Sequence, residues 1–193
     1  LESPDCVRII DQARLPHRFA FMDLRTPGEM CDAIRRMHLR GAGLIGCAAA
    51  WGLYPAARRH AAAPDFAAQM RAEAATLHAT RPTARNLDWA LDRVQKALAA
   101  CAPPERAETA RREAQTITDE DADFSLRMGR HGLELIRPIS ARKNGKPVNI
   151  LTHCNAGWLA FVDHGTALAP VYAAFDAGIP VHVWVDETRP RNQ

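Results

Sequence analysis

Two short polar segments near the carboxyl end of the chain carry the side chains best suited to chemistry. Residues 152–157 read THCNAG and place Cys154 beside a histidine and an amide, and residues 186–191 read DETRPR, with two acids and two arginines. A thiol becomes a useful acid or base when nearby cations or helix amides bring its pKa toward neutrality. Arginine binds phosphate or carboxylate through a planar fork of N–H donors. These residue types suit proton transfer on an anionic substrate.

Cys154 also has a plainer interpretation as a buried, unreactive thiol, which is common for free cysteines. Its position after an apolar run, among polar residues and glycines, favours the reactive interpretation. A metal site at His153 and Cys154 is disfavoured, because adjacent residues seldom ligate one ion and no partner pair of ligands is visible. We therefore expect no metal.

Three further segments could bind an anion. Arg40 precedes a flexible loop at 41–43 that leads into a helix, and Arg81 stands ahead of another helix start. Gly165-Thr166 opens a third helix, and free N–H groups at a helix start suit an anion. Each also has a plainer interpretation, because most arginines are surface residues and glycine-rich turns are common.

The elements that position the two polar segments form a strand, a helix and a second strand. The apolar run 148–152 predicts a buried strand, residues 165–177 a helix that ends at Gly178, and the alternating valines of 181–185 a second strand. This order is typical of a βαβ unit with parallel strands and a right-handed crossover. Because the carboxyl ends of parallel strands meet at one edge of a sheet, the segments after Thr152 and Val185 should come together.

Residues 1–146 predict a mainly helical domain with a few short strands. Apolar runs in 7–24 indicate two or three strands, and Thr26 with Pro27 and Glu29 marks a capped helix start. Helical spacing of apolar residues continues in 30–37, 44–57, 66–77, 87–98 and 105–136, and an interruption near 116–119 is left open. The expected class is α/β, in which 147–193 begin a Rossmann-like parallel sheet that is incomplete within these residues.

Composition narrows the functional class. The chain has 193 residues, 47% hydrophobic and 24% charged, which is typical of a globular protein. The net charge of +3 gives no reason to expect nucleic acid, and the longest apolar stretch, 44–57, is too short to span a membrane. Five cysteines without a CxxC pair argue against a disulfide framework and a structural zinc site. The same cysteine pattern favours a reducing, cytoplasmic setting. The amino-terminal residues do not resemble a signal peptide.

Several stretches together resemble the methylthioribose-1-phosphate isomerases, members of the wider family that includes initiation factor 2B subunits. The likeness covers nearly the whole chain, and the run around Cys154 is its most specific part, because the non-enzymatic subunits generally lack that cysteine. The matching stretches are 37–42 with Ile45-Gly46, 81–84 with Asn86-Leu87 and Trp89-Ala90, 150–157 and 185–191, together with Ile10-Asp11-Gln12 and Leu15-Pro16.

The resemblance implies conversion of 5-methylthioribose 1-phosphate to 5-methylthioribulose 1-phosphate in methionine salvage, by a homodimer that needs no metal or organic cofactor. The enzyme donates a proton to the ring oxygen and then moves a hydrogen between the first two sugar carbons. In the family a cysteine and an aspartate share the proton work. One catalytic and five substrate-binding residues match: Cys154, and then Arg40, Gly41, Ala42, Arg81 and Gln193.

Two departures from the family pattern matter. Gly43 stands where the family usually has proline, and the family's aspartate is expected beyond Gln193, because Asp186 does not match it. Residues 1–193 alone are therefore expected to be inactive. Two alternatives stay open: a related substrate, such as 5-deoxyribose 1-phosphate or ribose 1,5-bisphosphate, and a non-catalytic regulatory module like the initiation factor subunits.

Overall fold

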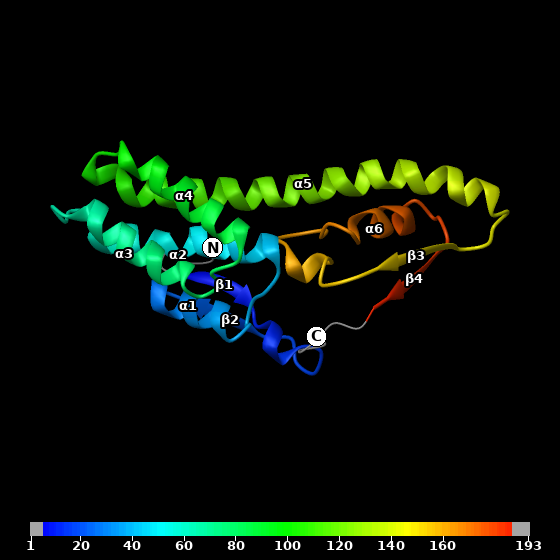
Figure 1. Cartoon of the computed structure of the whole chain (residues 1–193), viewed down its shortest axis with the longest axis horizontal. Coiled ribbons are helices and arrows are strands. Elements are labelled where there is room, and N and C mark those ends of the chain that lie inside the picture. The colour runs from blue at the N-terminus through cyan, green and yellow to red at the C-terminus, as the bar shows by residue number, and fades with distance from the viewer. Residues whose placement is uncertain (1–5, 187–193) are drawn as a thin grey trace. The chain divides into compact units, whose positions relative to one another are not determined.

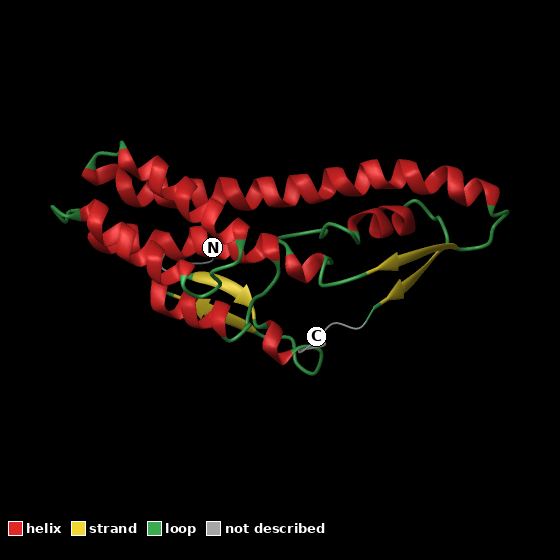
Figure 2. Cartoon of the chain, viewed as in Figure 1, coloured by secondary structure: helices red, strands yellow, loops and turns green. Residues whose placement is uncertain are grey.

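The computed structural model describes residues 6–186 and divides into two compact units, Leu1–Asp119 and Glu120–Gln193 (Figure 1). Most described residues are helical, and the strands occur as two separate pairs (Figure 2). This composition confirms the α/β class. The division between the units falls within a long helix, whereas the sequence suggests a boundary after residue 146. The domains expected over 1–146 and 147–193 stay a prediction, because compactness does not test which segments fold as domains.

The first unit joins an antiparallel strand pair to a set of packed helices. Strand β1 pairs with β2 so that Val7 lies opposite Leu24 and Ile10 opposite Phe21, as the apolar runs of 7–24 predict. The elements are β1 (Val7–Ile10), β2 (Phe21–Leu24), α1 (Pro27–Arg35), α2 (Ala42–His60), α3 (Phe66–His78), α4 (Arg85–Ala99) and the start of α5 (Arg106–Arg142), with short 3₁₀ turns at Gln12–Arg14 and Pro103–Glu105.

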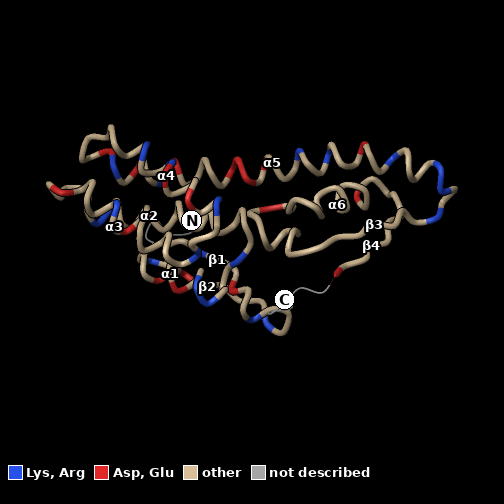
Figure 3. Tube along the Cα trace, viewed as in Figure 1, with Lys and Arg blue, Asp and Glu red and all other residues tan. Residues whose placement is uncertain are grey.

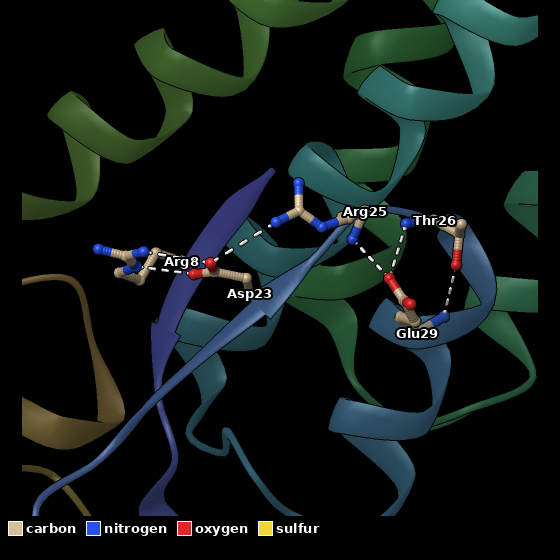
Figure 4. A network of polar contacts seen from close by, with 5 residues as sticks. All are labelled: Arg8, Asp23, Arg25, Thr26 and Glu29. Atoms are coloured by element: carbon tan, nitrogen blue, oxygen red, sulfur yellow. Dashed lines mark hydrogen bonds and ion pairs between the residues drawn. The ribbon is translucent and has the colours of Figure 1, made fainter. Parts of the chain in front are cut away.

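Helix α1 begins with the capping box that the sequence predicts (Figure 4). The Thr26 hydroxyl accepts the N–H of Glu29 at 3.2 Å, and the Glu29 carboxylate accepts the N–H of Thr26 at 3.0 Å. These bonds satisfy orphan donors of the first helical turn. On the strands before it, the Asp23 carboxylate accepts from Arg8 at 2.7 Å.

Small residues allow α2 to pack closely on its neighbours. A side chain at Gly46 would lie 3.0 Å from the Asn86 carbonyl oxygen of α4, and one at Gly52 would press on Leu77 of α3 at 3.1 Å. The alanines of α2 are largely buried, and Leu53 is fully buried. The small-residue segment is thus the tightly packed helix that its composition indicates.

Helix α5 runs without a break from Arg106 to Arg142, although the sequence pattern allows an interruption near 116–119. The hydroxyls of Thr116 and Thr118 donate to carbonyls one turn earlier, at 2.9 and 2.8 Å. The Thr118 hydroxyl also accepts from the indole of Trp51 at 2.9 Å. The polar residues that weaken the sequence pattern are therefore satisfied within and against the helix.

The second unit contains the predicted parallel pair, β3 (Val148–Thr152) and β4 (Val181–Val185). Val148 lies opposite Val181 and Thr152 opposite Val185, while α6 (Ala169–Asp176) connects the strands. The core of this unit is Ile136, Val148 and Ala174, with Ile150 and Val181 packed against it. On the other face, Leu151 and Trp184 are 71% and 58% exposed. Two strands leave the Rossmann-like description a prediction.

The helix expected over 165–177 begins later, at Ala169, and the expectation was wrong on this point. His164 and Gly165 both have positive φ, and the Thr166 N–H donates to the Ala156 carbonyl at 3.0 Å. These long-range bonds hold the segment as a loop. The predicted end is confirmed, since Gly178 follows the helix with φ of +71°.

Charges of both signs are distributed along the chain, with Lys and Arg gathered at the turn from α5 into β3 (Figure 3). Arg142, Lys143 and Lys146 lie there, where the partial negative charge of a helix C-terminus favours cations. None of the helices within residues 6–186 is both long and apolar enough to cross a membrane.

Candidate functional site

The carboxyl ends of β3 and β4 meet, as their parallel order predicts. His153 Nδ1 lies 3.0 Å from Asp186 Oδ2, and the Asp186 N–H donates to the Thr152 carbonyl at 3.2 Å. Strand pairing thus continues to the point where the polar segments begin. The remainder of the second segment, 187–191, lies outside the described residues.

Cys154 is an exposed free thiol directly after this edge. Its φ of +66° is left-handed, a conformation that costs a non-glycine residue about 1–2 kcal/mol. Cys6, Cys31 and Cys47 are buried instead, and burial raises the pKa of the Cys31 thiol. The interpretation of Cys154 as a buried thiol is therefore wrong. Strained residues concentrate at functional sites.

The loop after Cys154 is closed by a near contact of two glycines. The Ala156 carbonyl accepts the N–H of Thr166 at 3.0 Å, and a side chain at Gly165 would lie 2.5 Å from the Gly157 carbonyl carbon. Only glycine fits at 165, both for its space and for its φ of +76°. The loop carrying Cys154 thus returns on itself before α6.

Asp121 of α5 forms a hydrogen bond with the backbone of this loop. Its carboxylate accepts the N–H of Val162 at 2.9 Å. Burial raises the pKa of Asp121, and this single backbone hydrogen bond only partly offsets the effect.

The possible anion site at Gly165-Thr166 is not supported. The Gly165 N–H donates to the Asp163 carbonyl at 2.7 Å, and the Thr166 N–H is also engaged. Helix α6 begins only at Ala169, and Pro170 in its first turn has no N–H.

Arg40 and Gly41 stand at the start of α2 in the first unit. Gly41 has φ of 112° and ψ of 146°, a conformation accessible essentially to glycine alone. Its carbonyl accepts the N–H of Ile45 at 3.0 Å, so the N–H groups of 42–44 precede the first helical bond. Such groups, at the positive end of the helix dipole, are suited to a phosphate. Arg40 is partly buried directly before them.

Gly43 lies in the first turn of α2. Proline is tolerated at such positions, because the N–H of that turn has no helical acceptor. The departure from the family's proline therefore does not change the start of the helix.

A buried carboxylate that sequence reasoning missed lies beside this loop. Asp11 Oδ1 is 2.7 Å from His38 Nδ1, and the Asp11 side chain is only 4% exposed. Burial alone would raise the pKa of Asp11, but hydrogen bonds from His38 and Arg14 outweigh it, so the pKa lies below its usual value. The available signal was that both residues fall in stretches that match the same family.

Arg81 lies partly buried in the turn between α3 and α4. Its N–H donates to the His78 carbonyl at 3.1 Å, and its own carbonyl accepts from Ala84 at 3.0 Å. Arg40, Gly41, Ala42 and Arg81 all belong to the first unit and Cys154 to the second, while Gln193 lies outside the described residues. Across residues 6–186 no group of three His, Cys, Asp or Glu side chains could hold a metal ion.

Comparison with known sequences finds a matching family model and a set of similar proteins. The model of the Initiation factor 2 subunit family matches residues 38–193. The chain is 56% identical over 187 residues to the methylthioribose-1-phosphate isomerase of Cereibacter sphaeroides and 54% identical over 188 residues to that of Gluconobacter oxydans. Each match covers 97% of this chain and 50% of the relative, so the chain spans about half the length of the curated relatives it matches.

Two solved structures have the same fold over nearly the whole chain. The 5-methylthioribose 1-phosphate isomerase of Pyrococcus horikoshii has a TM-score of 0.83 at 36% identity and covers 97% of this chain and 52% of its own. The translation initiation factor eIF-2B, subunit delta, of A. fulgidus has a TM-score of 0.80 at 34% identity, covering 98% of this chain and 56% of its own. The resemblance stated from the sequence motifs is thereby confirmed.

Proposed function

The chain belongs to the Initiation factor 2 subunit family, and from this premise we propose that it carries binding and proton-transfer residues of an aldose–ketose isomerase. The proposed reaction converts 5-methylthioribose 1-phosphate to 5-methylthioribulose 1-phosphate in methionine salvage. The observation that carries the proposal is the identity of 56% with the Cereibacter sphaeroides isomerase across 97% of this chain.

Cys154 is proposed as one of the acid/base groups. In the reaction an acid gives a proton to the ring oxygen as the bond from that oxygen to C1 breaks. A hydrogen then moves from C2 to C1, and the C2 hydroxyl loses its proton as the carbonyl forms. One proton is gained and one is released, so the product is an isomer. The exposure of Cys154 and its strained position at a strand's carboxyl end support this role.

Arg40 with the N–H groups at the start of α2 is proposed to bind the phosphate, and Arg81 to contact the substrate. A guanidinium forms short, charge-assisted hydrogen bonds with phosphate oxygens. The free N–H groups beside Ala42 add to this attraction through the helix dipole. Gln193 keeps its proposed substrate contact from the family resemblance alone.

The test is to supply the complete gene product that carries these residues with 5-methylthioribose 1-phosphate and to measure the ketose formed. 5-Deoxyribose 1-phosphate and ribose 1,5-bisphosphate are assayed in parallel, and the largest kcat/KM identifies the substrate. If none of the three is isomerised, the proposed enzymatic function fails.

Residues 1–193 alone, assayed beside that gene product, are expected to show no turnover and poor stability. The resemblance places the second proton-transfer residue outside them, and the open sheet face at Leu151 and Trp184 favours aggregation. A soluble chain with normal turnover would show that these residues contain the complete acid/base pair.

A regulatory module without catalysis is the second candidate, favoured by the similar fold of the eIF-2B delta subunit. The two candidates differ at Cys154, which a purely regulatory module does not need. The homodimer and the cytoplasmic location also stay predictions, and sedimentation of the complete protein at micromolar concentration tests the former.

A further inference from the structure

We propose that Asp11 and His38 are positioning residues that hold the Arg40-Gly41-Ala42 loop in the form that receives the phosphate. The inference rests on the proposed function of that loop. It names two residues that would act through Arg40 without touching the substrate.

Both oxygens of the Asp11 carboxylate are engaged. Oδ1 lies 2.7 Å from His38 Nδ1 and accepts the N–H of Ala13 at 3.2 Å, while Oδ2 accepts from Arg14 Nε at 2.9 Å. With only 4% of the Asp11 side chain exposed, solvent competes little for these bonds. A buried charge with several donors is costly to disturb, so it fixes the groups around it.

The backbone reinforces the same connection. The Gln12 N–H donates to the His38 carbonyl at 2.8 Å, and the His38 N–H donates to the Ala33 carbonyl at 2.9 Å. Leu39 follows and is buried at 1% exposure. The segment directly before Arg40 is thus bonded to the 3₁₀ turn after β1 on one side and to α1 on the other.

Such a connection matters because the loop itself begins with glycine. Gly41 has few steric restrictions of its own, and an arginine side chain loses rotamer freedom when it binds. Fixing the residues before the loop lowers the entropy lost on binding, which is how a preorganised site gains affinity. His38 and Asp11 therefore should affect substrate binding more than turnover.

The first test replaces Asp11→Asn in the complete gene product. Asparagine has one acceptor oxygen in place of two, so at least one donor faces an amide N–H. Loss of one charge-assisted bond should raise KM for the sugar phosphate roughly tenfold. We expect kcat, normalised to folded enzyme, to stay within a fewfold. Asp23→Asn is the matched control, since it removes a half-buried carboxylate bound to Arg8 at 2.7 Å on the neighbouring strand.

A double-mutant cycle separates positioning from general damage. If Asp11 acts through Arg40, Asp11→Asn should add nothing to the KM of Arg40→Ala. Additive effects on KM would overturn the proposal. His38→Asn, which retains an N–H donor near the position of Nδ1, should preserve KM better than His38→Ala, and equal losses in both would also count against it.

Hydrogen exchange tests, without relying on activity, whether Asp11 and His38 hold the loop in place. Asp11→Asn should accelerate amide exchange in the segment 38–44 and leave α3 and α4 unchanged. If Arg40→Ala does not alter KM, the loop is not the phosphate site of the proposed function. Hydrogen exchange still shows whether Asp11 and His38 hold the loop in place. Unchanged exchange in 38–44 would overturn the positioning role, whatever the substrate proves to be.

Discussion

The loop of Arg40 and the loop of Cys154 both need a residue with positive φ, but a different residue type supplies it in each. Each contains a residue with positive φ at the point where a polar group is presented. In the first unit this residue is Gly41, at φ of 112°, while in the second it is Cys154 itself, at 66°. Glycine adopts such a conformation at little steric cost, whereas cysteine does so under strain. The difference supports the roles proposed for them, phosphate binding for the Arg40 loop and proton transfer for the Cys154 loop.

The two carboxylates beside these loops also differ. Asp11 has side-chain donors in His38 and Arg14, and their hydrogen bonds lower its pKa despite burial. Asp121 has only the N–H of Val162, and burial raises its pKa. Ionised Asp11 therefore stabilises the folded protein, whereas ionisation of Asp121 lowers the stability of the folded protein. Contact with a loop alone does not determine what a buried acid contributes.

The largest expected effect concerns the loop of Cys154. Cys154→Ser should reduce kcat about 10²–10⁴-fold, the usual contribution of an acid–base group. Thermal unfolding should change little, because the side chain is exposed. Cys101→Ser, at a partly buried thiol of the first unit, is the control. Turnover within a fewfold of the unmodified enzyme would remove Cys154 from the mechanism and with it the contrast between the loops.

Arg40→Ala should instead act on binding. We expect KM for the sugar phosphate to rise roughly 10- to 100-fold, since hydrogen bonds to charged groups contribute about 1.5–3 kcal/mol. Arg40→Lys should recover only part of this, because lysine lacks the planar fork. Arg25→Ala, at an exposed arginine 3.8 Å from Asp23, serves as the control for lost charge. Unchanged binding of phosphate-bearing ligands would exclude Arg40 from the proposed phosphate site.

Two glycines with similar φ test how the loop of Cys154 closes. Gly165→Ala should lower the free energy of unfolding by more than about 2 kcal/mol, because its methyl group meets the backbone of Gly157 in addition to the strain of positive φ. Gly178→Ala has the same backbone strain but nothing within 4 Å, so we expect a loss of about 1 kcal/mol. Chemical denaturation of both variants gives the comparison. Equal losses would mean that the loop opens to accommodate a side chain.

The pH dependence of stability gives the last comparison, between the two acids, of which Asp121 has the smaller expected effect. Asp121 binds its proton more tightly in the folded state, so its contribution to stability falls as pH rises from the ordinary aspartate pKa through its raised value. Asp121→Asn keeps an acceptor for the Val162 N–H. We expect the free energy of unfolding at neutral pH to stay the same or to rise by less than about 1 kcal/mol.

Asp11 should behave in the opposite sense. Its pKa is lowered in the folded state, so its contribution is present above the ordinary aspartate value and lost as pH falls through the lowered pKa. Asp11→Asn should therefore destabilise at neutral pH, by about 1–3 kcal/mol, and less in acid. Denaturation midpoints between pH 3 and 7 give both curves, and parallel curves for the two variants would contradict the assigned causes.

The sequence alone determined the elements whose signals are local. The capping box at Thr26, the strands at 148–152 and 181–185, and the placement of Cys154 directly after a strand all follow from spacing over a few residues. Parallel order then implied that the segments after Thr152 and Val185, which include His153 and Asp186, would come together. The family motifs could be recognised because they are contiguous.

Only the tertiary structure decided the contacts between distant segments. Asp11 and His38 are 27 residues apart, and Gly157 approaches Gly165 across a closed loop that delays the start of α6. The left-handed backbone of Cys154 likewise depends on its surroundings, as do the side-chain hydrogen bonds that lower the pKa of Asp11 and that Asp121 does not have. Close approach and long-range hydrogen bonds leave no periodic pattern in the chain, because they arise only when remote residues are packed together.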